Sequence, residues 1–322
     1  MNIPLVSVYV PCFNNEKTIK RCIDSLVCQT YANIEILVID NMSTDNSRDV
    51  VKELIKADNR IRLISCETRG LSAVRNTATP NAKGEWITTV DGDDSVEPEY
   101  VERLITVAKS RNADVVCCSH YYINVKKQRI KLSNFTGASK EDVHCFFLTK
   151  GRRFCQVWGK LYKKELLEKI TYPEGRIFED IAALPHVIEE AGKVIIIDEP
   201  LYDYYENSQS ISHKSKPENM MDGLEARLDN CSFYREKYHV LYPDAYDCVL
   251  DFGFFLLGRI YRAGRENYDA LYGEVVGIIK DALIMAGVDG FKMRRAVKIF
   301  LRNPEKAGKY FNAYSKRRIR GF

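Results

Sequence analysis

The chain has 322 residues, of which 45% are hydrophobic and 29% are charged, and its formal net charge is +4. This length and composition are those of an ordinary soluble globular protein with one large domain or two modest ones. No apolar run reaches the ~20 residues of a membrane-spanning helix, and the ten cysteines form no CxxC pair. These features exclude a transmembrane protein, and they favour reduced thiols in a cytoplasmic protein over disulfides or a zinc site.

Strand and helix signals alternate over the first 119 residues. Apolar, β-branched runs predict strands, and apolar residues spaced along one helix face predict the helices between them. We expect strands at 6–10, 34–39, 61–66, 86–90 and 115–119, and helices at 18–28, 47–55, 71–78 and from Pro98 onward. Near-continuous apolar strands separated by amphipathic helices indicate an α/β fold, with a mostly parallel sheet covered by helices on both faces.

Short polar segments follow three of these strands. They are PCFNN after the first strand, DNMSTD after the second and DGDD after the fourth. In open α/β sheets, ligands bind at the carboxyl ends of the strands. We therefore expect the three segments to lie on one rim of the sheet.

The alternation of strands and helices weakens after about residue 139. The segment VIIIDEPLYDYY predicts one more strand, and IFED precedes a helix that runs to Glu190. Past Ser215 the signals are almost all helical, at 222–238, 246–263, 268–286 and 292–302. We place a domain boundary near residue 215.

The C-terminal segment 291–322 is strongly basic. It carries eleven Lys or Arg residues against one acid, so its net charge is +10 and the rest of the chain sums to −6. The mildly acidic remainder argues against nucleic acid as a partner. The apolar residues Met293, Val297, Phe300 and Leu301 share one helical face and alternate with basic residues. This pattern is typical of a segment that lies on an anionic membrane surface. The alternative is that this face packs on the preceding helices.

Asp91, Gly92 and Asp93 come directly after the fourth expected strand. Mg²⁺ and Mn²⁺ prefer oxygen ligands, and they commonly take one or two protein carboxylates together with substrate phosphates. The two acids therefore suit a divalent cation that holds a diphosphate, and Gly92 leaves room for a close approach. The alternative is a solvated acidic turn before the next helix.

Four blocks of the sequence carry a family resemblance by their order and spacing. They are VSVYVPCFNNEKTIKRCIDSLVCQTYANIEILVIDNMSTDNS, RGLSAVRNTA, GEWITTVDGDDSVEPEYVERL and EGRIFED. Together they resemble the family 2 glycosyltransferases of GT-A fold, over roughly residues 4–213. The resemblance implies a nucleotide-sugar donor, a divalent cation (Mn²⁺ or Mg²⁺) at its diphosphate, an acidic base, and transfer with inversion.

The same resemblance suggests how the chain divides. It implies a GT-A catalytic domain over 1–215, followed by a helical C-terminal region with a basic tail over 216–322. Within the catalytic domain, the half that binds the nucleotide-sugar spans about 1–119, and the half that binds the acceptor spans about 120–215.

Carried over to this chain, the resemblance places five side chains around the nucleotide. Pro11 and Phe13 match positions beside the base, and Asp40 matches the first acid of the family's frequent DDGSTD string. Asn41 stands where a second acid usually contacts the uracil imide. Because an amide can still donate to and accept from a pyrimidine edge, a UDP-sugar stays the first expectation, and dTDP- and other nucleotide-sugars stay open. Arg75 matches a position near the base or the phosphates. The alternatives are core packing for Phe13 and an ion pair on a helix surface for Arg75.

At the acidic turn, the resemblance assigns the metal to Asp93 and places Asp91 nearer the ribose or the metal's waters, with Gly92 between them at the donor. For Asp94, a role at the metal and capping of the next helix are equal alternatives. Trp158 of VWGKLY is expected on the acceptor side, where stacking on a sugar and packing in the core are equal alternatives.

The catalytic base is matched to Asp180 of IFED, which would accept the proton of the attacking hydroxyl. The alternative is that Glu179 and Asp180 only stabilise the N-terminus of a helix beginning near Ile181. Further along, Tyr205 and Glu206 stand where the family often has an Arg, and His213 is either a diphosphate contact or a loop residue.

The resemblance implies an inverting glycosyltransferase that moves a sugar to a hydroxyl of a glycan or lipid-linked glycan in cell-surface polysaccharide synthesis. We expect a cytoplasmic enzyme, with peripheral contact to the inner face of the cell membrane through 291–322, and the aromatic C-terminal helices would permit a homodimer. One alternative is a catalytically silent, membrane-associated scaffold with the same fold. A second is a sugar-phosphate nucleotidyltransferase, although PCFNNEK is not the Gly-rich loop that such an enzyme needs.

Overall fold

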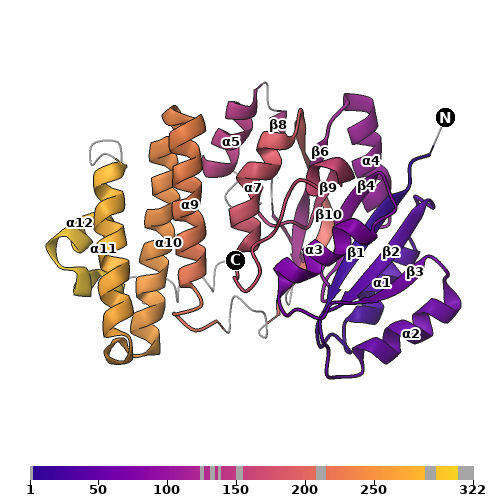
Figure 1. Ribbon diagram of the computed structural model, residues 1–322, viewed down its shortest axis with the longest axis horizontal. Coiled ribbons are helices and arrows are strands. Elements are labelled where there is room, and N and C mark those ends of the chain that lie inside the picture. The colour runs from indigo at the N-terminus through magenta and orange to yellow at the C-terminus, as the bar shows by residue number, and fades with distance from the viewer. Residues whose placement is uncertain are drawn as a thin grey trace. The chain divides into compact units, whose positions relative to one another are not determined.

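The computed structural model describes residues 3–123, 127–130, 135–136, 139–149, 155–207, 215–286 and 295–310 (Figure 1). The chain divides into two compact units. The first comprises Met1–Val143 and Arg153–Ser208, and the second comprises His144–Arg152 and Gln209–Phe322. The described strands all lie in the first unit, and the described elements of the second unit are helices.

One sheet contains the ten described strands, in the order β3-β2-β1-β4-β9-β6-β10-β5, with β7 beside β6 and β8 beside β10. The strands are β1 (Val6–Cys12), β2 (Ile34–Asp40), β3 (Ile61–Ser65), β4 (Trp86–Thr89), β5 (Ser95–Val96), β6 (Val115–Ile123), β7 (Lys127–Ile130), β8 (Phe135–Thr136), β9 (Lys160–Lys163) and β10 (Val194–Tyr205). The first four long strands pair in parallel, as the sequence predicted. Beyond β4 the sheet is mixed, because β9 runs antiparallel to both of its neighbours.

The helices of the first unit are α1 (Ile19–Val27), α2 (Ser47–Ala57), α3 (Leu71–Asn81), α4 (Tyr100–Arg111), α6 (Lys164–Leu167) and α7 (Glu179–Glu190), and residues of α5 (Lys140–Thr149) fall in both units. All residues of β1 and β2 are buried, which explains their continuous apolar runs. Val8 of β1 packs in one core cluster with Ile23 of α1 and Leu104 of α4. Tyr9 points to the opposite face of the sheet, where it lies near Arg75 of α3.

The second unit contains α9 (Met221–Lys237), η2 (His239–Leu241), α10 (Tyr242–Ala263), η3 (Arg265–Asn267), α11 (Asp269–Met285) and α12 (Arg295–Arg302). Helix α10 packs against both α9 and α11. A Cβ atom at Gly253 of α10 would lie 2.8 Å from Cγ1 of Ile279 on α11, so the glycine permits this close approach of the two helices. None of the described helices is long and apolar enough to cross a membrane.

The apolar face of α12 packs inside the second unit. Val297 and Phe300 are buried, and the Phe300 ring contacts Phe254 of α10 edge to face, with 5.4 Å between ring centroids. Leu301 remains half exposed. Of the two alternatives for this face, packing on a preceding helix is what the structure shows at Val297 and Phe300. Met293 and the basic residues from 311 onward lie outside the described residues.

Candidate active site

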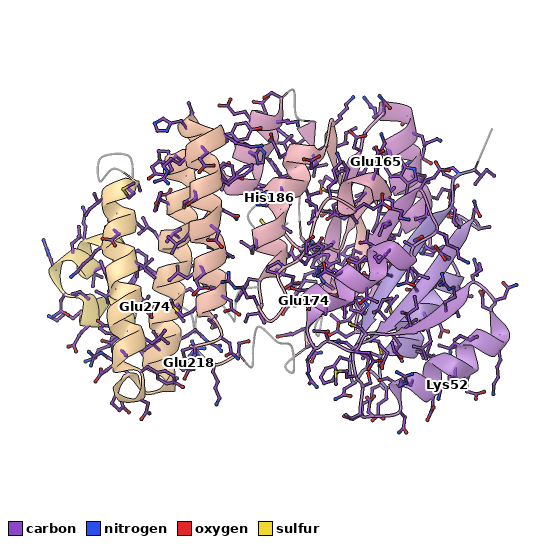
Figure 2. The ribbon with its side chains drawn as sticks, viewed as in Figure 1. Lys52, Glu165, Glu174, His186, Glu218 and Glu274 are labelled. Carbon is purple, nitrogen blue, oxygen red and sulfur yellow. The ribbon has the colours of Figure 1, made fainter. Side chains whose placement is uncertain are left out.

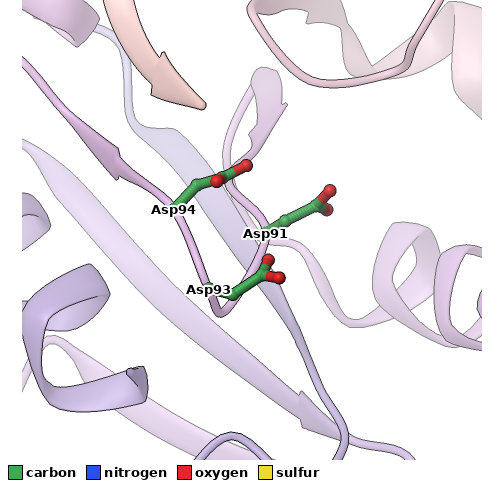
Figure 3. Close-up of side chains that lie close together, drawn as sticks. All are labelled: Asp91, Asp93 and Asp94. Atoms are coloured by element: carbon green, nitrogen blue, oxygen red, sulfur yellow. The ribbon is translucent and has the colours of Figure 1, made fainter. Parts of the chain in front are cut away.

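The turn that follows β4 carries three carboxylates. One oxygen atom from each of Asp91, Asp93 and Asp94 lies within 4.8 Å of the others, and Figure 3 shows the three side chains leaving one turn. The backbone N–H of Asp94 closes the turn by donating to the carbonyl oxygen of Asp91 at 2.9 Å. Carboxylates this close raise one another's pKa unless a cation compensates their charge.

The polar segments that follow β1, β2 and β4 meet on one rim of the sheet. Asn15, after β1, donates its backbone N–H to the hydroxyl of Ser47 at 2.7 Å. Thr18 donates its hydroxyl to the carbonyl oxygen of Gly92 at 2.9 Å. The three segments therefore support one another, and the acidic turn is held from the side of β1.

Gly92 is required by the closeness of the acidic turn to the end of β1. A Cβ atom at this position would lie 2.7 Å from the carbonyl oxygen of Pro11 and 3.1 Å from Oδ1 of Asn15. The first distance is shorter than real Cβ contacts, and a backbone atom cannot easily move away. The close approach that the sequence suggested at Gly92 is thus made by the chain's own backbone.

Asp94 does not cap the next helix, so the structure does not show the capping alternative for this residue. Its side chain is 1% exposed, and it accepts hydrogen bonds from the hydroxyl of Tyr202 at 2.7 Å and the backbone N–H of Tyr205 at 2.8 Å. Burial, together with the charges of Asp91 and Asp93, raises the pKa of Asp94 well above its usual value. Asp94 therefore connects the acidic turn to β10, and no local pattern in the sequence predicts this contact.

Asp91 and Asp93 are only partly buried. Burial raises the pKa of Asp91 to about 7, and the charge of Asp93 adds to the rise, while the guanidinium of Arg75 opposes it. Asp93 accepts a 2.7 Å hydrogen bond from Nδ2 of Asn207. Among the described residues, none donates a hydrogen bond to the carboxylate of Asp91.

These features fit a divalent cation at Asp91 and Asp93. Both groups offer hard oxygen atoms, and their mutual repulsion is what a cation would offset. Asp94 fits less well, because its two oxygen atoms are already engaged with Tyr202 and Tyr205. The cluster includes both residues that the sequence suggests as metal ligands, and metal binding by them is taken up as a proposal below.

Asp40 and Asn41, at the end of β2, are both buried and engaged within the chain. One carboxylate oxygen of Asp40 pairs with Nη1 of Arg48 at 2.7 Å, and the other oxygen, Oδ1, is buried without a partner. Asn41 donates from Nδ2 to the carbonyl oxygen of Thr68 at 2.6 Å and accepts the N–H of Gly70 at 2.8 Å. Its amide therefore holds the loop after β3, and Oδ1 of Asp40 is an unused buried acceptor.

Pro11 and Phe13 flank the end of β1. Pro11 lies inside the strand, which continues to Cys12 rather than ending at the proline. Phe13 is 38% exposed, and the Cζ atom of Arg69 lies 4.0 Å from its ring centroid. The core-packing alternative for Phe13 is therefore not what the structure shows, and the ring is accessible at the rim.

Arg75 is neither on a helix surface nor open to solvent. Its Nη2 atom forms a 2.8 Å ion pair with Oε1 of Glu179, and the two side chains are 7% and 5% exposed. Its Nε and Nη1 atoms are buried and have no hydrogen-bond partner. Sequence reasoning treated Glu179 only as a charge at a helix end, because no local pattern predicts that it is buried against α3.

Asp180 lies in the first turn of α7, which begins at Glu179 rather than near Ile181. Its side chain is partly exposed, and Oδ1 accepts the backbone N–H of Ile181 at 2.8 Å. The charges of Glu179 and Asp180 contribute to the raised pKa of Asp91. Asp180 and the acidic turn both lie in the first unit of the chain.

Arg21 is a residue of this rim that was not expected from the sequence. Arg21 of α1 donates to the carbonyl oxygen of Asp93 and packs on the Tyr205 ring, with its Cζ atom 3.6 Å from the ring centroid. Trp158 stacks on Tyr202 with 4.4 Å between ring centroids, which favours the packing alternative. His213 lies outside the described residues.

Residues 7–171 match the sequence profile described as Glycosyl transferase family 2. The chain belongs to this family. It is 32% identical to Glycosyltransferase GlyA of Streptococcus pneumoniae over 253 residues, which are 74% of this chain but only 36% of GlyA. It is also 30% identical to the cholesterol galactosyltransferase of Borreliella burgdorferi over 302 residues, covering 85% of this chain and 84% of that protein.

Among solved structures, this family 2 glycosyltransferase is similar to residues 1–349 of TarS from S. aureus in complex with UDP-GlcNAc. The TM-score is 0.67 at 18% sequence identity, over 97% of this chain and 92% of that chain. At this identity the likeness establishes the fold. The likeness confirms the GT-A fold with a helical C-terminal region. The match to the family profile confirms the expected family and the glycosyltransferase class of enzyme.

Proposed function

We propose that this glycosyltransferase moves a sugar from a nucleotide-sugar, with a UDP-sugar as first choice, to a hydroxyl of a glycan or lipid-linked glycan, with inversion at the anomeric carbon. The observation that carries the proposal is the cluster of carboxylates that Asp91, Asp93 and Asp94 form after β4, in a chain that matches the family 2 profile. The TarS structures bound to UDP-GlcNAc and to UDP support the choice of donor.

Asp91 and Asp93 would hold Mn²⁺ or Mg²⁺ at the donor diphosphate. A bound divalent cation supplies Lewis-acid stabilisation of the charge that develops on a departing nucleoside diphosphate. The chain supports these two acids from three sides. Gly92 allows the turn to contact β1, Asn207 donates to Asp93, and the Tyr202 hydroxyl accepts the Asp91 N–H at 3.1 Å.

For the nucleotide, we propose a site formed by Pro11, Phe13, Asp40 and Asn41, with Asp91 and Gly92 toward the phosphates. Arg75 is left out of this site, because its guanidinium is buried against Glu179. Phe13 offers an accessible ring on which a base could stack. Asp40 offers Oδ1, the unused buried acceptor. Because Asn41 is engaged with the loop after β3, we propose that it shapes the pocket rather than selecting the base by itself.

Asp180 would accept the proton of the acceptor hydroxyl as the hydroxyl attacks the anomeric carbon. A positioned general base contributes on the order of 10²–10⁴-fold to such a step. The proposal has one base and no covalent intermediate, because Glu179 is paired with Arg75 and is therefore a poor nucleophile. A single displacement of this kind inverts the anomeric configuration.

We propose residues 1–215 as the catalytic domain and 216–322 as a helical extension. Peripheral contact with the inner face of the membrane would be made through the basic tail. Because Val297 and Phe300 of α12 are buried, this contact would depend on charge more than on an inserted apolar face. A role in cell-surface polysaccharide synthesis, and a homodimer formed through the C-terminal helices, belong to the same proposal.

A screen of nucleotides by thermal shift tests the proposal. UDP, dTDP, GDP and CDP are each added with and without Mn²⁺ to the wild type, to Asp93→Ala and to Glu165→Ala, which removes an exposed acid elsewhere in the unit. We expect one nucleotide to raise the melting temperature only with metal, in the wild type and Glu165→Ala but not in Asp93→Ala. If no nucleotide binds under any condition, the proposal is wrong, and the alternative of a catalytically silent scaffold with the same fold replaces it.

A further inference from the structure

Two consecutive residues of α3, Arg75 and Asn76, bond to the segment that leads into α7. Asn76 bonds both backbone groups of Tyr172, because its Nδ2 donates to the Tyr172 carbonyl oxygen and its Oδ1 accepts the Tyr172 N–H, each at 2.9 Å. Arg75 pairs with Glu179 at 2.8 Å. The segment between these two anchors, 172–179, is therefore held at both ends by the same helix.

The segment itself departs from relaxed backbone geometry. Phe178, the residue before Glu179, has a φ of +64° in the left-handed region, which costs a non-glycine residue ~1–3 kcal/mol and persists only where surrounding contacts enforce it. Asn76 also reaches Glu174 of this segment, labelled in Figure 2, at 3.4 Å. The contacts of α3 at Tyr172, Glu174 and Glu179 help to hold the segment that contains Phe178.

The burial of Arg75 argues against a direct role at the donor. Its Nη2 atom is used by Glu179, and its other two guanidinium nitrogens are shielded from solvent. A buried ion pair contributes little net stability, because desolvation of both charges opposes their attraction. Such a pair is better explained by the geometry that it fixes, and the residue that follows Glu179 is Asp180.

We propose that Arg75, Asn76 and Glu179 are positioning residues, which clamp the 172–179 segment onto α3 and thereby fix Asp180 toward the acidic turn. They act through the backbone of the first turn of α7 and not through contact with the donor. The inference rests on the proposed role of Asp180 as the base. A displacement of a catalytic group by 1 Å can lower a rate by about 10²-fold, so loosening this clamp has a measurable cost in turnover.

The test uses four variants and a matched control. Arg75→Met and Glu179→Gln each break the ion pair from one side, the double variant removes both charges, and Asn76→Ala releases Tyr172. Glu35→Gln is the control, because Glu35 is also a buried acid paired with an arginine, Arg62, but it lies in β2 away from the rim.

Three readouts separate a positioning role from a structural one. We expect UDP binding with Mn²⁺, measured by calorimetry, to change less than about 3-fold in every variant. Release of UDP from UDP-GlcNAc, used as the probe donor, should fall on the order of 10- to 100-fold in kcat with little change in KM. Hydrogen exchange in 172–183 should accelerate in the four variants and stay unchanged in Glu35→Gln.

The double variant is the sharpest comparison. Removing both buried charges should restore the melting temperature relative to either single variant, yet turnover should stay low because the segment is still free. A recovery of turnover together with stability would overturn the proposal. A loss of UDP binding above 10-fold in Arg75→Met with retained kcat would overturn it as well, and would make Arg75 a donor ligand.

Failure of the proposed function looks different. In that case wild-type protein shows no turnover of any UDP-sugar, while the exchange measurement still reports on the clamp. Unchanged exchange in 172–183 of all four variants would overturn the clamp whether or not the enzyme is active.

Discussion

The hydroxyl of Tyr202 on β10 donates a 2.7 Å hydrogen bond to the carboxylate of Asp94 in the acidic turn. The same hydroxyl accepts the backbone N–H of Asp91 at 3.1 Å. One phenol therefore joins two positions of the turn to the strand at the far side of the site. Asp94 is tied to the fold so that Asp91 and Asp93 can face a ligand.

Replacing Tyr202 by Phe should weaken both the fold and the metal site. The buried Asp94 loses a donor, which costs ~1–3 kcal/mol of unfolding free energy, and loss of an outer support of a metal ligand typically lowers metal affinity by about 10–100-fold. Urea unfolding and Mn²⁺ titration measure the two effects. The control is Tyr162→Phe, which removes a buried hydroxyl bonded to Val157; an equal loss of Mn²⁺ affinity there would contradict the account.

Replacing Gly92 by Ala should disrupt the acidic turn. The new Cβ would lie 2.7 Å from the Pro11 carbonyl oxygen, so either the turn or β1 must move, and we expect nucleotide binding with Mn²⁺ to fall at least 10-fold. Gly277→Ala is the matched control, since it lies in α11 with no atom within 4 Å of the new Cβ. That change should stabilise the protein by up to ~1 kcal/mol. Undiminished binding in Gly92→Ala would show that the turn tolerates displacement.

Replacing Asn41 by Asp should destabilise the loop after β3. The carboxylate would present an oxygen to the Thr68 carbonyl oxygen in place of the Nδ2 donor, which leaves two buried acceptors facing one another at a cost of ~1–3 kcal/mol. Urea unfolding measures the cost. If Asn41→Asp is as stable as the wild type and binds UDP more tightly, then the amide selects the base directly and the loop-holding role is secondary.

The stability of the first unit should depend on pH through His120. Burial lowers the pKa of His120 to about 4, and the charge of Lys160 adds to the effect, whereas an unfolded histidine titrates near ~6.5. Between these values the unfolded state binds the extra proton, so unfolding free energy falls as pH falls from about 6.5 to about 4. The loss is on the order of 3 kcal/mol, and above pH ~6.5 His120 contributes no slope.

Urea unfolding of wild type and His120→Gln at pH 7.5, 6 and 5 checks this pH dependence. The difference in unfolding free energy between the two proteins should shrink as the pH falls, because the variant lacks the titrating group. Parallel pH profiles for the two proteins would show that His120 does not titrate differently on folding.

The parts of the fold that the sequence predicted depend on local patterns. Runs such as those of β1 and β2 are apolar because both faces are buried, and this burial leaves a signal in consecutive residues. The polar segments after β1, β2 and β4 follow from the rule that binding groups lie at strand ends. The order of four short blocks along the chain identified the family, and the family resemblance predicted roles for Asp91, Asp93 and Asp180.

What the sequence did not predict depends on contacts between distant residues. Strand β9 pairs antiparallel with both β4 and β6, and a four-residue strand is too short for its sequence to predict this pairing. The local sequence suggests that Asp94 caps a helix, but its carboxylate accepts a hydrogen bond from Tyr202, more than a hundred residues later in the chain. The burial of Glu179 likewise depends on Arg75 of α3. In each case the partner, rather than the local sequence, decides the role.

The most direct test of the central claim compares Asp180→Asn with Asp93→Ala in binding and in turnover. UDP affinity in the presence of Mn²⁺ is measured by calorimetry, and release of UDP is measured from a panel of UDP-sugars. We expect Asp180→Asn to bind UDP as the wild type does while its turnover falls at least 10²-fold, and Asp93→Ala to lose metal-dependent binding. Turnover of Asp180→Asn at the wild-type rate would contradict the account, because the base would then lie elsewhere.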